Sequence, residues 1–171
     1  MRVYVKKLVP EARIPEKANN NDFCYDVWAI SEEEVSPGVW KYGLGLAFQI
    51  DKEASFPAIQ EQIVSTNGVQ MTENHFINTD SFTLSIDLRP RSSIYKTGMI
   101  LSNCEATIDE GYRGEVAAIF YHVKPELPRY KVGDKLGQIK IGITFPIEFE
   151  EKNKLDESTR GKKGFGSSGE K

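Results

Sequence analysis

Residues 139–150 read IKIGITFPIEFE, and apolar side chains occupy every second position from Ile139 to Phe149. Because successive side chains of a strand point to opposite faces, this alternation predicts a long strand with one apolar face. Pro146 cannot donate a backbone hydrogen bond, so it indicates an edge position or a bend. The segment FTLSIDL, residues 82–88, alternates in the same way and predicts a second strand of this kind.

Shorter apolar runs extend the strand pattern over most of the chain. Residues 39–50 and 115–123 are apolar at positions of both parities, which predicts strands buried on both faces. Val3 and Val5 indicate a short first strand, and glycine-containing turns separate the later runs: SPG (36–38), KTG (96–98), DEG (109–111) and VGD (132–134). Many short strands with regular turns predict an all-β sandwich or barrel.

The composition is that of one globular domain. The chain has 171 residues, of which 39% are hydrophobic and 27% charged, and its formal net charge is −3. This charge, without a basic stripe, argues against a stable nucleic-acid partner. No apolar run approaches the roughly 20 residues that span a bilayer, and the first ten residues lack the apolar core of a signal peptide. We therefore expect a cytoplasmic, or otherwise intracellular, protein with no membrane association.

Two segments depart from the strand pattern. Residues 52–80 are polar and irregular, and AIQEQIVS (58–65) predicts two helical turns, so we interpret 52–80 as an insertion in a single barrel domain covering 1–150. Residues 151–171 begin with charges and end in GKKGFGSSGEK, from which no core can be built. They predict a mobile C-terminal arm.

Three segments carry side chains that suit a nucleotide. RPRSS (89–93) offers guanidinium and hydroxyl donors for phosphate oxygens at a strand end, although alone it is better interpreted as a solvated turn. ATIDEGYRGE (106–115) places Asp109 where a carboxylate could deprotonate a water, and an ordinary hairpin explains it equally well. RGKKGFGSSG (160–169) combines phosphate-binding glycines with Phe165, a ring able to stack on a base, where a disordered tail is the alternative.

Two further residues are ambiguous on their own. Asp26 lies in the apolar run YDVWA (25–29), where an unpaired charge would be costly, so it forms either an outer contact to a metal or a hydrogen-bonded structural pair. Gln138 ends GDKLGQ (133–138) and either contacts a phosphate or is an outward strand residue.

In this order, the five segments resemble the five motifs of the homotrimeric dUTP diphosphatases (dUTPases). YDVWA resembles the first motif, RPRSS the second, NCEATIDEGYRGE (103–115) the third, GDKLGQ the fourth and RGKKGFGSSG the fifth. The third and fifth are the specific ones, and together the motifs cover nearly the whole chain.

This resemblance implies a distorted jelly-roll β-barrel and a homotrimer with three shared active sites. The C-terminal arm of one subunit would close over a site that the others build. The implied reaction is hydrolysis of dUTP to dUMP and pyrophosphate by water attack at the α-phosphorus, with Mg²⁺ on the triphosphate. Such a reaction limits uracil incorporation into DNA and supplies dUMP for dTMP synthesis.

The resemblance also implies roles for individual residues. Asp109 would be the catalytic base, and Tyr112 would pack on deoxyribose and exclude a 2′-hydroxyl. Asn103 and the backbone up to Asp109, with Thr107 and Ile108, would read uracil, and Asp26 would contact the metal through water. The other matched residues would contact phosphates or, for Phe165, stack on uracil: Arg91, Ser92, Ser93, Gln138, Arg160, Phe165, Gly166, Ser167 and Ser168.

Three positions depart from the family pattern, and two other functions stay open. Cys24 and Ala106 stand where the family usually has glycine, and Gly137 stands where alanine is common. A dCTP deaminase, sometimes bifunctional, shares the fold and the RSS motif but needs a glutamate beside the base. A non-catalytic relative that senses nucleotides or binds proteins through the insertion is the other alternative.

Overall fold

The computed structural model describes residues 1–52, 59–66, 69–75, 81–103 and 105–162, and its elements are almost all strands, which confirms the all-β class. The elements are β1 (Arg2–Lys7), β2 (Tyr25–Trp28), β3 (Ser31–Ser36), β4 (Val39–Gly43), β5 (Leu46–Asp51), β6 (Ile59–Thr66), β7 (Val69–His75), β8 (Thr83–Pro90), the 3₁₀ helix η2 (Ser92–Lys96), β9 (Met99–Leu101), β10 (Ala106–Asp109), β11 (Ala117–His122) and β12 (Lys135–Thr144).

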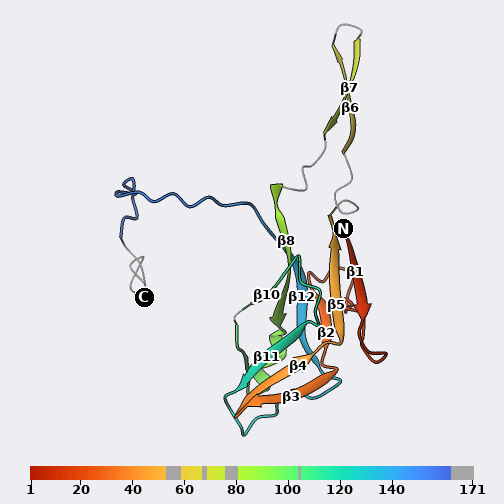
Figure 1. The fold of residues 1–171 in the computed structure, drawn as a ribbon, viewed down its shortest axis with the longest axis vertical. Helices are drawn as coiled ribbons and strands as arrows, with labels where there is room; N and C mark the ends of the chain where they lie inside the picture. The colour runs from red at the N-terminus through yellow and green to blue at the C-terminus, as the bar shows by residue number, and fades with distance from the viewer. Residues whose placement is uncertain (53–58, 67–68, 76–80, 104, 163–171) are drawn as a thin grey trace.

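Two four-stranded antiparallel sheets form the body of the molecule. One has the order β10-β8-β12-β2 and the other β3-β4-β11-β9, while β1 and β5 pair beside them (Figure 1). Apolar side chains on one face of each sheet are buried, such as Leu84, Ile86 and Leu88 on β8 and Phe120 on β11. They belong to one core, as expected for the jelly-roll fold.

The long alternating segment forms a strand over only part of its length. β12 pairs with β8 from Gly137 to Thr144, and Thr144 lies opposite Thr83, the first residue of β8. The alternation continues beyond Thr144, but β8 offers no further partner and Pro146 lacks an N–H. Apolar side chains beyond the strand are consequently exposed: Phe145 by 64%, Ile147 by 69% and Phe149 by 92%.

Two runs were expected to be strands buried on both faces. Residues 39–50 confirm the burial, since every residue from 42 to 48 is buried, but they are not one strand. Residues 39–50 form two strands in different sheets, β4 and β5, separated at Gly45, whose φ is 63°. A Cβ at Gly45 would lie 2.8 Å from Val9 Cγ2, so glycine also permits the close approach. In β11 only one face is buried, and Ile119 and Tyr121 are 38% and 48% exposed.

The prediction of two helical turns within residues 58–65 is wrong. The backbone of residues 59–66 and 69–75 forms β6 and β7, an antiparallel pair that is a sheet of its own and extends away from the body (Figure 1). Pairing with β7 depends on residues outside 58–65, so the helical spacing within that window does not reveal it. It suits the β-branched residues Ile63, Val64 and Thr66.

The described part of the C-terminal arm is exposed. Residues 145–162 contain no strand or helix and run away from the sheets (Figure 1). Residues 163–171 lie outside the described part of the chain. Among the residues that are described, no helix is both long enough and apolar enough to cross a bilayer.

Candidate active site

The second motif lies where β8 passes into η2. Arg91 is the N-cap residue of η2, with φ −76° and ψ 157°, and its carbonyl accepts a hydrogen bond from Ile94 N at 3.0 Å. Ser92 and Ser93 are the first two residues of the helix, and Ser92 is exposed. The change from strand to helix therefore places a guanidinium and two hydroxyl groups together at one strand end.

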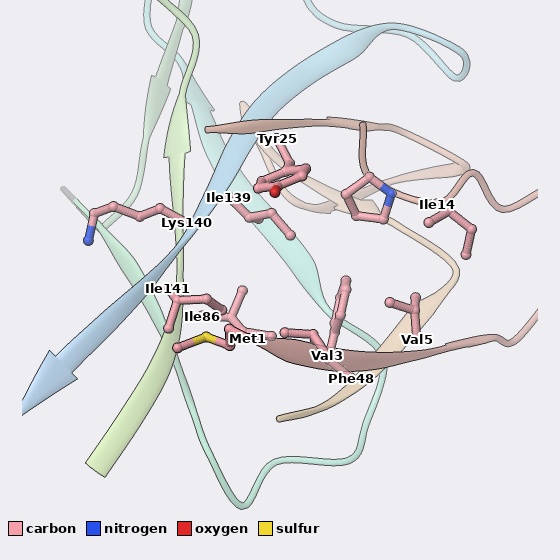
Figure 2. A pocket seen from close by; sticks show the side chains of 11 residues that line it. Met1, Val3, Val5, Ile14, Tyr25, Phe48, Ile86, Ile139, Lys140 and Ile141 are labelled. Carbon is pink, nitrogen blue, oxygen red and sulfur yellow. The ribbon is translucent and has the colours of Figure 1, made fainter. Parts of the chain in front are cut away.

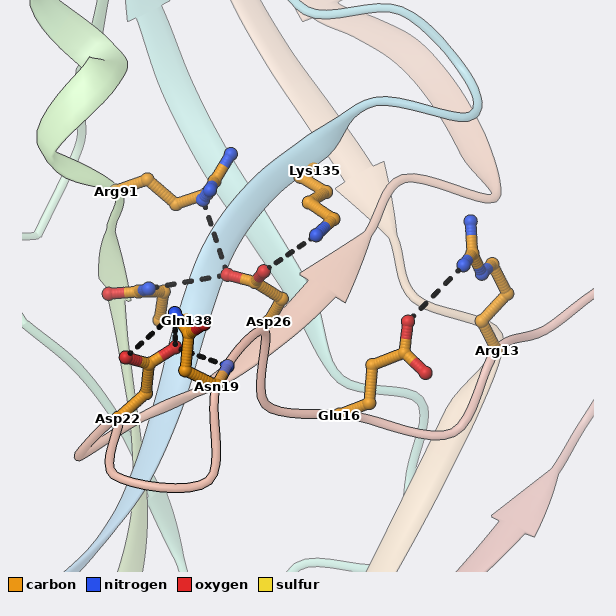
Figure 3. A network of polar contacts seen from close by, with 8 residues as sticks. All are labelled: Arg13, Glu16, Asn19, Asp22, Asp26, Arg91, Lys135 and Gln138. Carbon is orange, nitrogen blue, oxygen red and sulfur yellow. Dashed lines mark hydrogen bonds and ion pairs between the residues drawn. The ribbon is translucent and has the colours of Figure 1, made fainter.

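Asp26 is the centre of a buried polar cluster that joins three of the motifs (Figure 3). It is 2% exposed, and its Oδ2 accepts a hydrogen bond from Lys135 Nζ at 2.9 Å. Its Oδ1 accepts one from Gln138 Nε2 at 3.2 Å and lies 3.2 Å from Arg91 Nε. Within this chain, Asp26 therefore forms hydrogen-bonded and ionic pairs, which is the structural alternative expected for it.

The electrostatics of this cluster favour the charged carboxylate. Burial alone would raise the pKa of Asp26, but the hydrogen bonds from Lys135 and Gln138 and the positive charges of Arg91 and Lys135 outweigh it. The pKa of Asp26 consequently lies below its usual value. Asp26 thereby fixes Arg91 and Gln138, which are two of the expected phosphate contacts.

An irregularity in β12 brings Lys135 and Gln138 to the same carboxylate. Side chains three residues apart on a regular strand point to opposite faces. The register of β12 against β2 shifts between Lys135 and Gly137, and this bulge turns both side chains toward Asp26. Lys135 lies inside the fourth motif but is not among the site residues expected from the sequence.

Asp109 is the last residue of β10 and begins a tight turn. Tyr112 N donates to Asp109 O at 3.0 Å, and the Asp109 side chain is exposed. The neighbouring Glu110 carboxylate anchors this turn, because its Oε2 accepts from Leu84 N at 3.0 Å and lies 3.0 Å from Lys52 Nζ. Burial would raise the pKa of Glu110, but these interactions with Leu84 and Lys52 prevail and lower it.

A second buried carboxylate fixes β10 from the side of β8. Asp87 is 5% exposed, accepts from Ser85 Oγ at 2.8 Å and pairs with Lys140. Burial opposes its ionisation, but the hydrogen bonds from Lys140 and Ser85 outweigh it, so the pKa of Asp87 is lowered. Thr107 lies directly opposite Asp87. The cross-strand contacts of Asp87 therefore connect β10, the strand that carries Asp109, to β8 and β12.

The third motif surrounds a cavity of about 440 Å³. Its lining residues are Lys41, Asn103, Ala106, Thr107, Ile108, Asp109, Tyr112, Glu115, Val116 and Ala117. Five of them are residues expected from the sequence to bind base, sugar or water: Asn103, Thr107, Ile108, Asp109 and Tyr112. The Tyr112 hydroxyl donates to Glu115 O at 3.1 Å, which fixes the ring at the cavity wall.

Two of the departures from the family pattern now have a structural setting. Ala106 lies in β10 opposite Leu88 and lines the cavity, so its methyl group forms part of the wall. A Cβ at Gly137 would lie 2.9 Å from the carbonyl oxygen of Arg89 on the neighbouring strand. The close approach of two backbones therefore explains glycine at position 137.

The expected site residues fall into two groups within this chain. Among the described residues, Arg91, Ser92, Ser93 and Gln138 do not line the cavity that contains Asp109. Arg160 is exposed on the arm and does not line this cavity either. Phe165, Gly166, Ser167 and Ser168 lie outside the described residues.

Three residues at the site are not among those expected from the sequence: Lys41, Glu110 and Glu115. Glu110 and Glu115 lie within the third motif, so the motif was the available signal. Lys41 lies in a strand far from every motif, and only the fold brings it to the cavity.

Comparisons with known proteins agree on one family. The family model described as dUTPase matches residues 45–169. Proteins named deoxyuridine 5′-triphosphate nucleotidohydrolase are similar over the whole chain: that of Clostridium novyi is 29% identical, covering 99% of both chains, and that of Helicobacter pylori strain Shi470 is 27% identical, covering 99% of this chain and 97% of the relative.

Solved structures show the same fold. The dUTPase of Staphylococcus bacteriophage 80alpha with dUPNHPP superposes with a TM-score of 0.66 at 20% identity, covering 98% of each chain. The dUTPase from phage phi11 of S. aureus, in a structure described as revealing the coordination of a structural Mg(II) ion, has a TM-score of 0.60 at 16% identity and covers 92% of this chain and 100% of that one.

Proposed function

Since the chain belongs to the dUTPase family, we propose that its site hydrolyses dUTP to dUMP and pyrophosphate. The observation that carries this proposal is the cavity of the third motif, which Asn103, Asp109 and Tyr112 all line. The chain is a dUTP diphosphatase, and its reaction removes dUTP as a source of uracil in DNA and supplies dUMP for dTMP synthesis.

Asp109 is the residue we assign to the water. Its carboxylate is exposed at the end of β10, while Glu110 beside it is engaged with Leu84 and Lys52. A base must reach the water and keep lone pairs available, so Asp109 suits the role and Glu110 suits the anchor. Asp109 would orient a water for attack on the α-phosphorus and take up its proton.

Tyr112 and the strand before it would select the nucleoside. The Tyr112 ring is fixed through its hydroxyl and is half-exposed at the cavity, where it can pack on deoxyribose. Asn103 and the backbone through Thr107 and Ile108 would meet the uracil edge. A site whose polar groups match uracil leaves them unpaired with cytosine, which is a strong basis for discrimination.

The Asp26 cluster suits the triphosphate. Arg91 and Gln138 are held by Asp26, and the Ser92 and Ser93 hydroxyls lie next to Arg91 in the chain. Prearranged cationic and neutral donors stabilise charge on a phosphoryl group without reorganising during the reaction. Arg160, Gly166, Ser167 and Ser168 would add donors from the arm, and Phe165 would stack on uracil.

Mg²⁺ fits this site as part of the substrate complex. Among the described residues, no three acidic, histidine or cysteine side chains form a cluster that could hold an ion. Asp26 is engaged by Lys135, Gln138 and Arg91, so it suits an indirect contact through water and not direct ligation. When bound to the triphosphate, Mg²⁺ would neutralise phosphate charge.

Three features support a trimer with shared sites. Within the described chain, the cavity that contains Asp109 is not lined by the expected phosphate contacts Arg91, Ser92, Ser93 and Gln138. Phe145, Ile147 and Phe149 are exposed on the segment between β12 and the arm, where they bury little surface in their own subunit. An apolar groove of about 280 Å³ between β1 and β12 offers a complementary surface, lined by side chains such as Val3 and Ile139 (Figure 2).

A deaminase is less compatible with the cavity. The carboxylates among its described lining residues belong to Asp109 and Glu115. Glu115 Oε1 accepts a hydrogen bond from Gly45 N at 2.8 Å, so this side chain is held at the backbone between β4 and β5. No further glutamate in the described wall is available to act on a base.

The direct test is product identification. The protein with Mg²⁺ is incubated separately with dUTP, dCTP, dTTP and UTP, and pyrophosphate, ammonia and nucleotide products are measured. Release of dUMP and pyrophosphate from dUTP alone is expected. Ammonia from dCTP would identify a deaminase, and no turnover of any nucleotide would identify a non-catalytic relative.

Subunit mixing tests the shared site. A chain truncated after Ser158 lacks the arm donors, and Asp109→Asn lacks the base, so each is expected to be inactive alone. If the arm and Asp109 of one site come from different subunits, randomly mixed trimers at equal ratio regain both in roughly a quarter of sites. Inactive mixtures, once mixed trimers are demonstrated by mass, would exclude the shared arrangement.

A further inference from the structure

Lys41 is a cation in the wall of the Asp109 cavity that no sequence motif contains. It lies in the middle of β4 and is half-buried. Glu33 is its direct neighbour on β3, but among the described residues the Lys41 ammonium has neither an ion-pair nor a hydrogen-bond partner. A half-buried ammonium at a cavity, without a protein partner in the described chain, is available to a ligand.

The register of the sheet places Lys41 at the end of the cavity that also contains Asn103. Lys41 lies opposite Ile119 on β11, and Ile119 O accepts a hydrogen bond from Ser102 N at 2.9 Å. Lys41, Ile119 and Ser102 therefore lie at one level across the sheet, and Asn103 follows directly. Both side chains border the same end of the cavity.

Asp109 and Tyr112 belong to the other end. The Tyr112 hydroxyl is bonded to the carbonyl of Glu115, four residues before Ile119. At about 3.3 Å per strand residue, these two levels are roughly 13 Å apart. With the α-phosphate at Asp109 and the sugar at Tyr112, the remaining part of the nucleoside, the base, would extend toward Lys41.

We propose that Lys41 reads the base by donating a hydrogen bond to the C4 carbonyl oxygen of uracil. This inference rests on the proposed dUTP hydrolysis and adds a specificity-determining residue to it. An ammonium group can only donate. Uracil has a carbonyl at C4, whereas cytosine has an amino group there that also donates, so the same Lys41 attracts dUTP and opposes dCTP.

The experiment compares Lys41→Met with wild type on dUTP and dCTP. A hydrogen bond to a charged group accounts for roughly a 10- to 100-fold difference in affinity, so kcat/KM for dUTP should fall by that factor, mainly through KM. The value for dCTP should stay or rise, which narrows the dUTP/dCTP ratio. Lys124→Met, on an exposed lysine away from this cavity, is the matched control and should leave both values unchanged.

The affinity for nucleoside monophosphates, which are not hydrolysed, gives an independent measurement. Calorimetry with dUMP and dCMP should show the same loss for dUMP in Lys41→Met, and Lys41→Gln, which keeps a neutral N–H donor, should be intermediate. The Gln variant also serves if the Met variant fails to fold.

Two outcomes separate the failures. Equal losses on dUTP and dCTP, or an unchanged ratio in an active variant, would overturn the role of Lys41 and leave dUTP hydrolysis standing. A wild type that does not hydrolyse dUTP would overturn the proposed function and this inference with it.

Discussion

Replacing Asp26 by asparagine removes the charge on which two cations and one amide converge. The Asp26 side chain is 3% exposed, whereas the Arg91 and Lys135 side chains are 32% and 35% exposed. At an effective dielectric constant of 20, each pair attracts by about 4 kcal/mol before desolvation. Solvent screens these cations, which are about one-third exposed. The free energy of unfolding should therefore fall by about 2–3 kcal/mol, less than the 3–5 kcal/mol lost when a fully buried pair is broken.

The pH dependence of the stability difference between wild type and Asp26→Asn tests this assignment. The pKa of Asp26 in the folded protein is lowered, while an unfolded aspartate titrates near about 3.9. The stability that Asp26 contributes is therefore fully present above about pH 3.9 and is lost as the pH falls through its folded pKa. The asparagine variant does not titrate at this position. The difference in free energy of unfolding between the two proteins, called the gap below, should therefore shrink only below about pH 4.

Urea unfolding of wild type and Asp26→Asn at pH 7, 5, 4 and 3 measures this gap at fixed protein concentration, because assembly would also affect stability. Asp156→Asn makes the same charge change on the exposed arm and should unfold like wild type. A gap below about 0.5 kcal/mol at pH 7, or one that persists undiminished at pH 3, would refute the assigned electrostatics.

Four other changes test the site and its frame. Asp109→Asn should lower kcat for dUTP by roughly 10²–10⁴ with intact folding, and turnover within a few-fold of wild type would reject it as the base. Gly137→Ala should cost about 1–3 kcal/mol in urea unfolding because its Cβ meets a backbone carbonyl, whereas Gly111→Ala, with no atom within 4 Å of the added Cβ, should be nearly neutral. Tyr112→Ala should narrow the kcat/KM ratio of dUTP to UTP, and an unchanged ratio would remove its ring from the sugar site. Joining the chain across a deletion of 54–79 should preserve the soluble assembly in size-exclusion chromatography, since β6 and β7 pair only with each other among the described strands.

Strand periodicity was informative where one face is buried and misleading where a partner strand ends. Alternation identified β8 and most of β12, because burial on one face leaves a period of two in the sequence. The same alternation continues to Phe149, but strand pairing stops at Thr144 because β8 begins at Thr83. The helical spacing within 58–65 failed for a related reason, since β7 supplies its partner from outside that window.

The sequence by itself determined the all-β class and the segments that contain the site, because turn glycines, alternating strands and the third motif are local in the chain. Only the tertiary structure decided which side chains meet. The bulge after Lys135 turns that residue toward Asp26, and the pairing of β4 with β11 brings Lys41 to a cavity built by residues more than sixty positions away. Such contacts depend on strand order and register, which non-local backbone pairing sets and no short stretch of sequence records.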